Sequence, residues 1–137
     1  MNVWVHLIWT TKNREPLITD QLKLTLFTHI RENARKKDIY LDFINGVADH
    51  VHALLRLKAD QTISKIAQLL KGESSHWVND QKLSGAYFEW QDEYTALSVS
   101  GSLVRTVREY IGKQEEHHRR NTLEDEARTL SEECDGV

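Results

Sequence analysis

The chain has 137 residues, of which 39% are hydrophobic and 28% are charged, with one proline and six glycines. This is the length of one domain and the composition of a globular protein, which excludes collagen-like and disordered chains. No apolar run approaches the roughly 18–20 residues of a membrane span, and no basic segment precedes the first apolar run, so we expect neither a membrane segment nor a secretory signal. The single cysteine, Cys134, excludes an internal disulfide and fits a reducing compartment, and we therefore expect a cytoplasmic protein.

Charge is distributed unevenly along the chain. Residues 1–120 contain 17 Lys and Arg against 15 Asp and Glu, whereas residues 121–137 contain one Arg against six acidic residues. We therefore expect a folded domain over residues 1–121 and a solvated acidic tail over residues 122–137. The slight positive balance of the domain is compatible with nucleic-acid binding but does not predict it, because strongly basic domains are the usual electrostatic footprint.

The first 57 residues predict a strand, a helix and a β-hairpin. Residues 3–10 are mainly β-branched and aromatic, which is typical of a strand. Thr19 then provides an N-cap for a helix whose apolar residues recur at helical spacing. Residues 39–47 and 50–57 follow as two strands with Asn45-Gly46 at their join, so we expect an antiparallel hairpin.

The rest of the chain predicts a helix, a strand and a second helix. The first of these helices begins after Asp60 or Thr62 and pauses near Gly72. Residues 86–99 predict an interrupted fourth strand, and residues 103–119 a final helix. The order β-α-β-β-α-β-α matches the split βαβ, ferredoxin-like arrangement. We therefore expect an α+β fold, with an antiparallel sheet that carries helices on one face, plus the C-terminal helix.

His50-Val51-His52 is the first candidate for metal chemistry. In a strand, residues i and i+2 point to the same face about 6.5 Å apart, so the two imidazoles project side by side. Imidazole is a common neutral ligand of divalent metals, and two of them supply two-thirds of a facial site. The alternative is a pair of exposed polar residues on a half-buried strand.

The final predicted helix adds a phenol and an amide. Tyr110 and Gln114 fall inside or at the edge of its apolar arc, one turn apart. A buried amide needs partners, and its oxygen would complete a His-His-Gln ligand set with Tyr110 beside the metal. The alternative is that Tyr110 is a core aromatic residue and Gln114 lies at a helix edge.

These groups together suit one reaction. Three neutral ligands leave the full charge of Mg²⁺ or Mn²⁺ available to polarise a phosphate. A tyrosine hydroxyl, with an intrinsic pKa near 10, is a poor nucleophile unless such an ion activates its target. A covalent phosphotyrosine conserves the energy of the broken phosphodiester and allows rejoining. The set therefore predicts cleavage and transfer of nucleic-acid strands.

Three motifs, in this order, resemble the small single-tyrosine transposases of the His-hydrophobic-His (HUH) superfamily. They are DHVHALL at 49–55, SKIAQLLKGESS at 64–75 and YIGKQ at 110–114. HLIWTTK at 6–12 and the aromatic residues from 88 to 96 are also similar to that family, so the resemblance spans roughly residues 3–121.

The resemblance implies more than the residue pattern does. Such enzymes excise and insert single-stranded DNA at hairpin-bearing ends through a 5′-phosphotyrosine, with Mg²⁺ or Mn²⁺, and act as homodimers. The tyrosine helix of one subunit can complete the metal site of the other. His50, His52 and Gln114 match the metal ligands, and Tyr110 matches the nucleophile. Relatives that act on repetitive extragenic palindromes share the site.

Five cations on the predicted helices are candidate DNA-phosphate contacts, although ordinary surface charge is the alternative for each, because phosphate-binding residues carry no sequence mark. They are Lys65, Lys71, Arg105, Arg108 and Lys113. Two further functions remain open at this point. One is a non-catalytic nucleic-acid-binding module on the same fold, and the other is a domesticated nuclease that processes palindromes.

Overall fold

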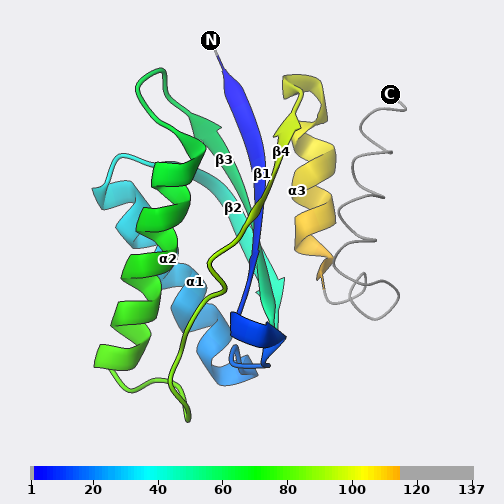
Figure 1. Ribbon diagram of the computed structural model, residues 1–137. Coiled ribbons are helices and arrows are strands. Elements are labelled where there is room, and N and C mark those ends of the chain that lie inside the picture. The colour runs from blue at the N-terminus through cyan, green and yellow to red at the C-terminus, as the bar shows by residue number, and fades with distance from the viewer. Residues whose placement is uncertain (1, 115–137) are drawn as a thin grey trace.

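A computed structural model describes residues 2–114 and contains the strands and helices that the sequence predicts, in the same order (Figure 1). The elements are β1 (Val3–Thr10), the 3-10 turn η1 (Lys12–Arg14), α1 (Asp20–Lys36), β2 (Tyr40–Val47), β3 (His50–Leu57), α2 (Ile63–Asp80), β4 (Thr95–Val99), the 3-10 turn η2 (Gly101–Leu103) and α3 (Val104–Gly112).

The described strands form one antiparallel sheet in the order β2-β3-β1-β4. Strand β3 lies between β1 and β2, which is the split βαβ topology of ferredoxin-like folds, so the predicted α+β class is confirmed. Helices α1 and α2 cover one face of the sheet, and α3 lies on the other face (Figure 1).

Two hydrophobic cores lie on the two faces of the sheet. Val51, Ala53 and Leu55 of β3 point into the larger core, which packs against α1 and α2. Leu54 points the other way, into a smaller core with the apolar side of α3. Because side chains alternate along a strand, His50 and His52 share the face of Leu54. The alternation of β3 therefore sends both histidines toward α3.

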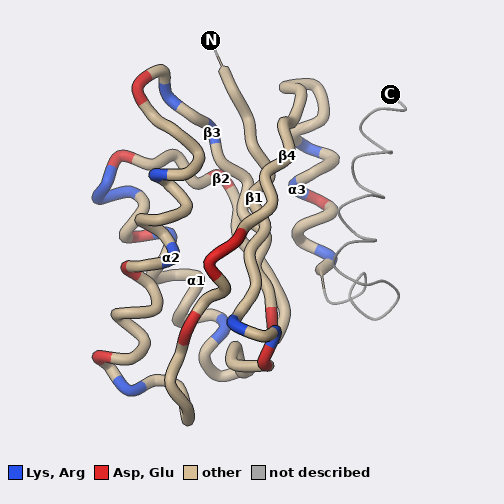
Figure 2. The backbone as a smooth tube through the Cα atoms, viewed as in Figure 1, with Lys and Arg blue, Asp and Glu red and all other residues tan. Residues whose placement is uncertain are grey.

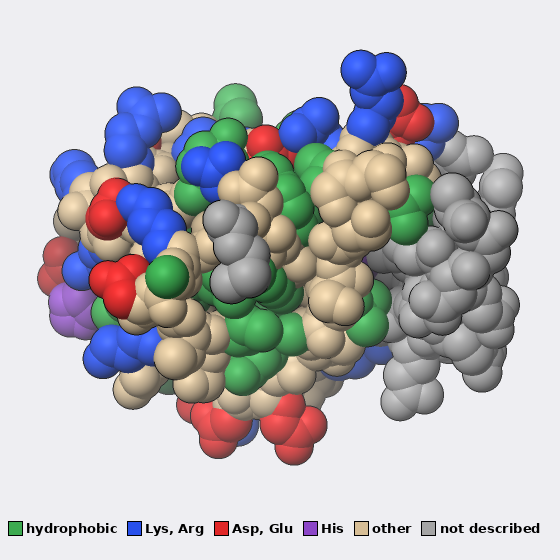
Figure 3. Space-filling view, turned by 90° about the horizontal axis from the view of Figure 1, so that it is seen from above, with side chains coloured by type: hydrophobic (Ala, Val, Ile, Leu, Met, Phe, Trp, Pro, Cys, Tyr) green, Lys and Arg blue, Asp and Glu red, His purple; other side chains and the backbone are tan. Residues whose placement is uncertain are grey.

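Charged residues lie mainly on the helices, loops and strand ends (Figure 2). Strand β1 has no Asp, Glu, Lys or Arg, which suits a central strand covered on both faces. Viewed from the end where β1 begins, hydrophobic side chains lie at the centre, with Lys and Arg side chains along the upper and left edges and acidic side chains at the lower edge (Figure 3). None of the helices among residues 2–114 has the length and apolar character that a membrane span requires.

The predicted starts of α1 and α2 each include a side-chain cap. Thr19 accepts a hydrogen bond from the backbone N–H of Leu22 at 3.2 Å, and Thr62 accepts one from Lys65 at 3.2 Å. The predicted pause at Gly72 is wrong, because α2 continues to Asp80. Its buried side continues past the glycine with Ser74 and Val78, and this packing outweighs the small helix penalty of one glycine.

The fourth strand is shorter than predicted. It covers Thr95–Val99 alone, and residues 86–94 form a loop with one isolated bridge between Trp90 and Thr11. Asn79 of α2 holds this loop with two side-chain bonds of 2.8 Å, one from its amide to the carbonyl of Phe88 and one to its oxygen from the N–H of Phe88. Phe88 and Trp90 are buried and anchor the loop to the core, rather than pairing in a ladder.

The predicted hairpin is present, but its turn lies elsewhere. Asn45 and Gly46 pair with His52 and Val51 inside the ladder, and the chain turns at residues 48–49. Gly46 is required because β2 and β3 approach each other closely here: a Cβ at this position would lie 2.3 Å from the carbonyl oxygen of His50.

The final helix also differs from its prediction at its start. A 3-10 turn over residues 101–103 precedes α3, and neither turn nor helix begins with a side-chain cap. Helix α3 ends at Gly112. The predicted extension to residue 119, the domain boundary at 121 and the acidic tail lie outside the described residues.

Candidate active site

Strand β3 and the end of α3 bring four sequence-predicted residues together on one face of the sheet. His50, His52 and Gln114 are fully buried, and Tyr110 is 7% exposed. The ring centroids of His50 and His52 lie 5.1 Å apart, and those of His52 and Tyr110 lie 6.2 Å apart. The histidines are thus not exposed polar residues, and Gln114 does not lie at a solvated helix edge.

Each of the two histidines is held through its Nδ1 atom. Asp49 Oδ1 lies 2.8 Å from His50 Nδ1, and His6 Nε2 of β1 lies 2.8 Å from His52 Nδ1. Carboxylate and imidazole partners of this kind fix the tautomer and the orientation of metal-binding histidines. The sequence motifs include Asp49 and His6, but no spacing in the sequence predicts these two roles.

The environment of His6 keeps its ring neutral. Burial holds the pKa of His6 well below its usual value, and the neighbouring His52 lowers it further. A neutral His6 can accept the Nδ1 proton of His52 at Nε2, which leaves the ring lone pair of His52 on its Nε2 atom. The His6 ring also lies edge-on to Tyr110, with centroids 6.4 Å apart.

The donor atoms fit a divalent metal ion. His50 Nε2 lies 3.4 Å from Gln114 Oε1, so an imidazole nitrogen and an amide oxygen face each other in a buried space. The amide nitrogen of Gln114 has no hydrogen-bond partner among the described residues. Within residues 2–114, no group of three or more His, Cys, Asp and Glu is arranged to hold an ion, so a site here needs the amide as third donor.

The five predicted DNA contacts occupy different environments. Lys65, Arg105 and Lys113 are exposed to solvent. Arg108 forms a two-bond pair with Asp42 at 2.8 and 3.1 Å.

Lys71 differs from these because it is half-buried. Its Nζ donates to the carbonyl oxygens of Asp92 and Glu93 at 2.9 and 3.2 Å. Burial lowers the pKa of Lys71, and the Asp92 carboxylate opposes this. Lys71 therefore holds the loop that precedes β4.

Known proteins are similar to this chain over most of its length. A family model described as "Transposase IS200 like" matches residues 1–114. The chain is 28% identical over 115 residues to the ISDra2 transposase TnpA of Deinococcus radiodurans, which covers 80% of this chain and 81% of that protein.

Two solved structures share the fold. One is a candidate transposase from Deinococcus radiodurans R1, with a TM-score of 0.66, 26% identity and coverage of 83% of this chain and 92% of the other. The second is a REP-associated tyrosine transposase bound to a REP hairpin, with a TM-score of 0.65, 17% identity and coverage of 85% and 68%.

The fold and these matches define the class as the single-tyrosine transposases of the HUH superfamily, which confirms the resemblance predicted from the sequence. The chain belongs to the IS200-like transposase family, whose members are DNA strand-transferring enzymes that act in transposition.

Proposed function

We propose that this protein is a metal-dependent single-stranded DNA transposase that cleaves and rejoins DNA at hairpin-bearing ends through a 5′-phosphotyrosine. The observation that carries this proposal is the position of Tyr110 beside the buried pair His50 and His52, with Gln114 Oε1 facing His50. The solved neighbour with a bound REP hairpin supports the choice of a hairpin substrate.

His50, His52 and Gln114 are the residues that would hold Mg²⁺ or Mn²⁺. The ion, when bound, supplies positive charge that makes the scissile phosphate electrophilic. Asp49 and His6 keep the two imidazoles in the orientation that such binding needs, through their bonds to Nδ1. All three ligands are neutral, so the ligands themselves add no negative charge that would repel the DNA phosphate.

Tyr110 is the proposed nucleophile. Its hydroxyl oxygen attacks the phosphorus and loses its proton, while the bond from phosphorus to the O3′ atom of the preceding nucleotide breaks and that oxygen takes up a proton. The products are a free 3′-hydroxyl and a 5′-phosphate linked to Tyr110. Attack on this linkage by a 3′-hydroxyl reverses the step and releases the tyrosine, so rejoining needs no external energy source.

Metal removal tests this proposal directly. A 5′-labelled single strand that contains a hairpin is incubated with the protein in Mg²⁺, in Mn²⁺ and in excess EDTA. We expect cleavage with either ion, none with EDTA, and recovery when Mg²⁺ is restored. Undiminished cleavage in EDTA contradicts a metal-dependent reaction. Binding without cleavage under every condition favours the non-catalytic binding module.

We propose in addition that the enzyme is a homodimer. The family resemblance supports this assembly. The sheet also ends in β4, a five-residue edge strand next to the Ser100-Gly101-Ser102 segment that leads into α3. Light scattering at micromolar concentration tests it, and a monomeric but fully active protein contradicts it.

A further inference from the structure

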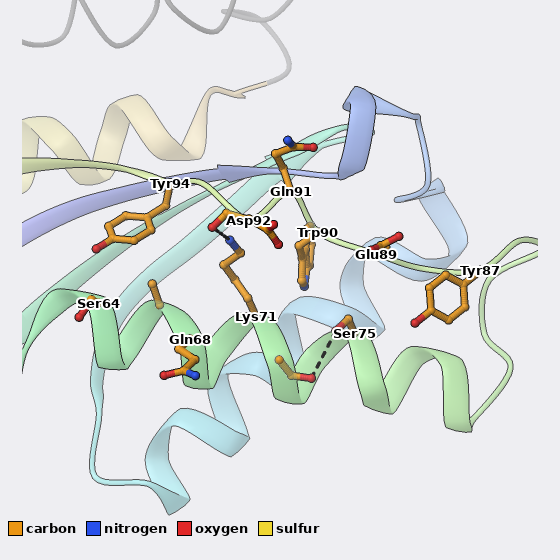
Figure 4. A pocket seen from close by; sticks show the side chains of 12 residues that line it. Ser64, Gln68, Lys71, Ser75, Tyr87, Glu89, Trp90, Gln91, Asp92 and Tyr94 are labelled. Carbon is orange, nitrogen blue, oxygen red and sulfur yellow. Dashed lines mark hydrogen bonds between the residues drawn. The ribbon is translucent and has the colours of Figure 1, made fainter.

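A second site lies between α2 and the loop that leads into β4. It is a pocket of about 430 Å³, and its residues come from the middle of α2 and from residues 87–94 (Figure 4). Tyr87 and Tyr94 lie toward its two ends with Trp90 between them (Figure 4). Tyr87 is 74% exposed and Tyr94 is 38% exposed, so two aromatic rings stand uncovered at the rim.

The pocket has a fixed floor. Trp90 is 5% exposed, and its indole N–H donates to Ser74 Oγ of α2 at 3.0 Å. Lys71 holds the loop to α2 through the carbonyl oxygens of Asp92 and Glu93. The aromatic side chains are therefore attached to a loop that is bonded to α2 at three points, through Lys71, Ser74 and Asn79.

A glycine in the helix wall keeps the pocket open. Gly72 lies in the interior of α2, where glycine is less favourable than alanine. A Cβ at Gly72 would meet no atom within 4 Å, and its φ is not positive, so neither close packing nor backbone geometry requires glycine here. Gly72 lines the pocket, and any larger side chain would occupy that space.

The charges around the pocket do not suit an anion. Glu89 and Asp92 line it, and Figure 2 shows acidic residues along this loop. The Lys71 ammonium, the cation in the lining, already donates to two carbonyl oxygens. Gln68 and Ser64 add neutral donors and acceptors. Exposed aromatic rings with amide and hydroxyl groups suit a flat, uncharged heteroaromatic ring, which they can stack on and hydrogen-bond.

The loop also links the pocket to the active-site end of the sheet. The N–H of Gln91 donates to the carbonyl of Thr10 at 2.9 Å, and Thr10 pairs with His50 across the β1–β3 ladder. Gln91 is thus two strand spacings from His50, on the order of 10 Å. The pocket and the active site lie near the same end of the sheet but on opposite faces, so a nucleotide chain that reaches the active site would enter the pocket by passing around that end.

We propose that this pocket binds one unpaired nucleobase of the DNA strand that is cut at Tyr110. The inference rests on the proposed function for the presence of single-stranded DNA. It adds a base-binding subsite on the α2 side of the molecule that stacks the base on Tyr87 or Tyr94. The phosphates of the strand remain outside the acidic lining.

Filling the pocket tests the proposal. The variants are Gly72→Leu, which places a side chain in the pocket, and Gly72→Ala as the matched small substitution. The probes are a fluorescein-labelled 20-nucleotide strand of randomised sequence and a strand of equal length built only from abasic nucleotides, both measured by anisotropy. Both variants replace a helix-interior glycine, so their melting temperatures should equal or exceed that of the wild type.

We expect Gly72→Leu to weaken binding of the base-bearing strand about tenfold, as for the loss of one base–aromatic stack, and to leave the abasic strand unchanged. Gly72→Ala should bind both strands nearly as the wild type does. Tyr87→Leu should weaken the base-bearing strand in the same way, whereas Tyr40→Leu, at an exposed tyrosine outside the pocket, should not.

Unchanged binding of the base-bearing strand by Gly72→Leu overturns the proposal. Equal losses for the base-bearing and abasic strands also overturn it, because the pocket would then act on the phosphate backbone. These outcomes are separate from the proposed function, which fails if the wild type forms no covalent DNA adduct, whatever the variants bind.

Discussion

Asp49 and His6 decide which nitrogen of each histidine is presented to Tyr110 and Gln114. Asp49 lies at the Nδ1 atom of His50, and His6 lies at the Nδ1 atom of His52. Partners of metal-binding histidines raise ligand basicity and hold the ring, and their loss typically costs 10–100-fold in metal affinity. The two residues are therefore positioning residues for the proposed metal ligands.

Replacement of Asp49 tests this role without touching a proposed ligand. We expect Asp49→Ala to weaken Mn²⁺ binding by roughly 10–100-fold in isothermal titration calorimetry, because His50 loses the carboxylate at Nδ1. Asp42→Ala is the matched control, since Asp42 pairs with Arg108 and lies toward the other end of β2 from Val47, which pairs with His50. Equal Mn²⁺ affinity in the two variants would show that Asp49 does not position His50.

The site could be predicted only in part from single residues. The i, i+2 spacing predicts that His50 and His52 share a face, and the helical arc places Tyr110 and Gln114 inward. The contact between His6 and His52 joins residues 46 positions apart, and it depends on the register that pairs Ile8 with His52. No local pattern specifies that register, so the role of His6 requires the structure.

At the level of elements, hydrophobic patterns were the reliable signal and turn signals were not. Strands β1 and β3 match their predicted bounds because apolar residues dominate each run. Residues 86–90 have the same composition, but Phe88 is bonded to Asn79 at both backbone atoms and forms no ladder. Tertiary contacts of this kind override strand propensity.

Asn45-Gly46 shows the same limit for a turn motif. The pair is a strong hairpin signal, yet it lies inside β2, where Gly46 lets the strand approach His50 closely. The signal identified the hairpin correctly and placed its turn wrongly. The glycine is needed for the site rather than for the turn.

A methyl group at residue 46 should therefore lower the free energy of unfolding. Gly46→Ala would place a Cβ 2.3 Å from the carbonyl oxygen of His50, and backbone must move to relieve the contact. We expect a loss of about 1–3 kcal/mol in the free energy of unfolding in urea, together with weaker Mn²⁺ binding. Gly101→Ala, where a Cβ meets no atom within 4 Å, should retain both properties. Equal stability of the two variants would contradict the close-approach role.

For the whole molecule, the third layer is what completes the site. Helix α3 packs on the sheet of its own chain, with Val107 and Ile111 fully buried in the smaller core. This packing places Tyr110 beside the histidines of the same chain. In a homodimer with this arrangement, each active site is built from one subunit.

Mixing two inactive variants distinguishes this arrangement from a shared site. His50→Ala and Tyr110→Phe are co-purified as a mixed dimer and assayed for cleavage. We expect no recovery of activity, because every site that is built from one chain lacks either His50 or Tyr110. Recovery of cleavage in the mixed dimer would mean that the tyrosine helix completes the site of the partner subunit.

The covalent adduct between protein and DNA is the direct test that Tyr110 is the nucleophile. A hairpin-bearing single strand labelled at its 3′ end, the part that a 5′-phosphotyrosine retains, is incubated with Mg²⁺ and with wild type, Tyr110→Phe or Tyr94→Phe. The labelled protein is then resolved under denaturing conditions, and the modified residue is mapped by mass spectrometry. We predict an adduct at Tyr110 in wild type and Tyr94→Phe and none in Tyr110→Phe, whose folding and hairpin binding persist within about 1 kcal/mol. An adduct that still forms in Tyr110→Phe would contradict the assignment of the nucleophile.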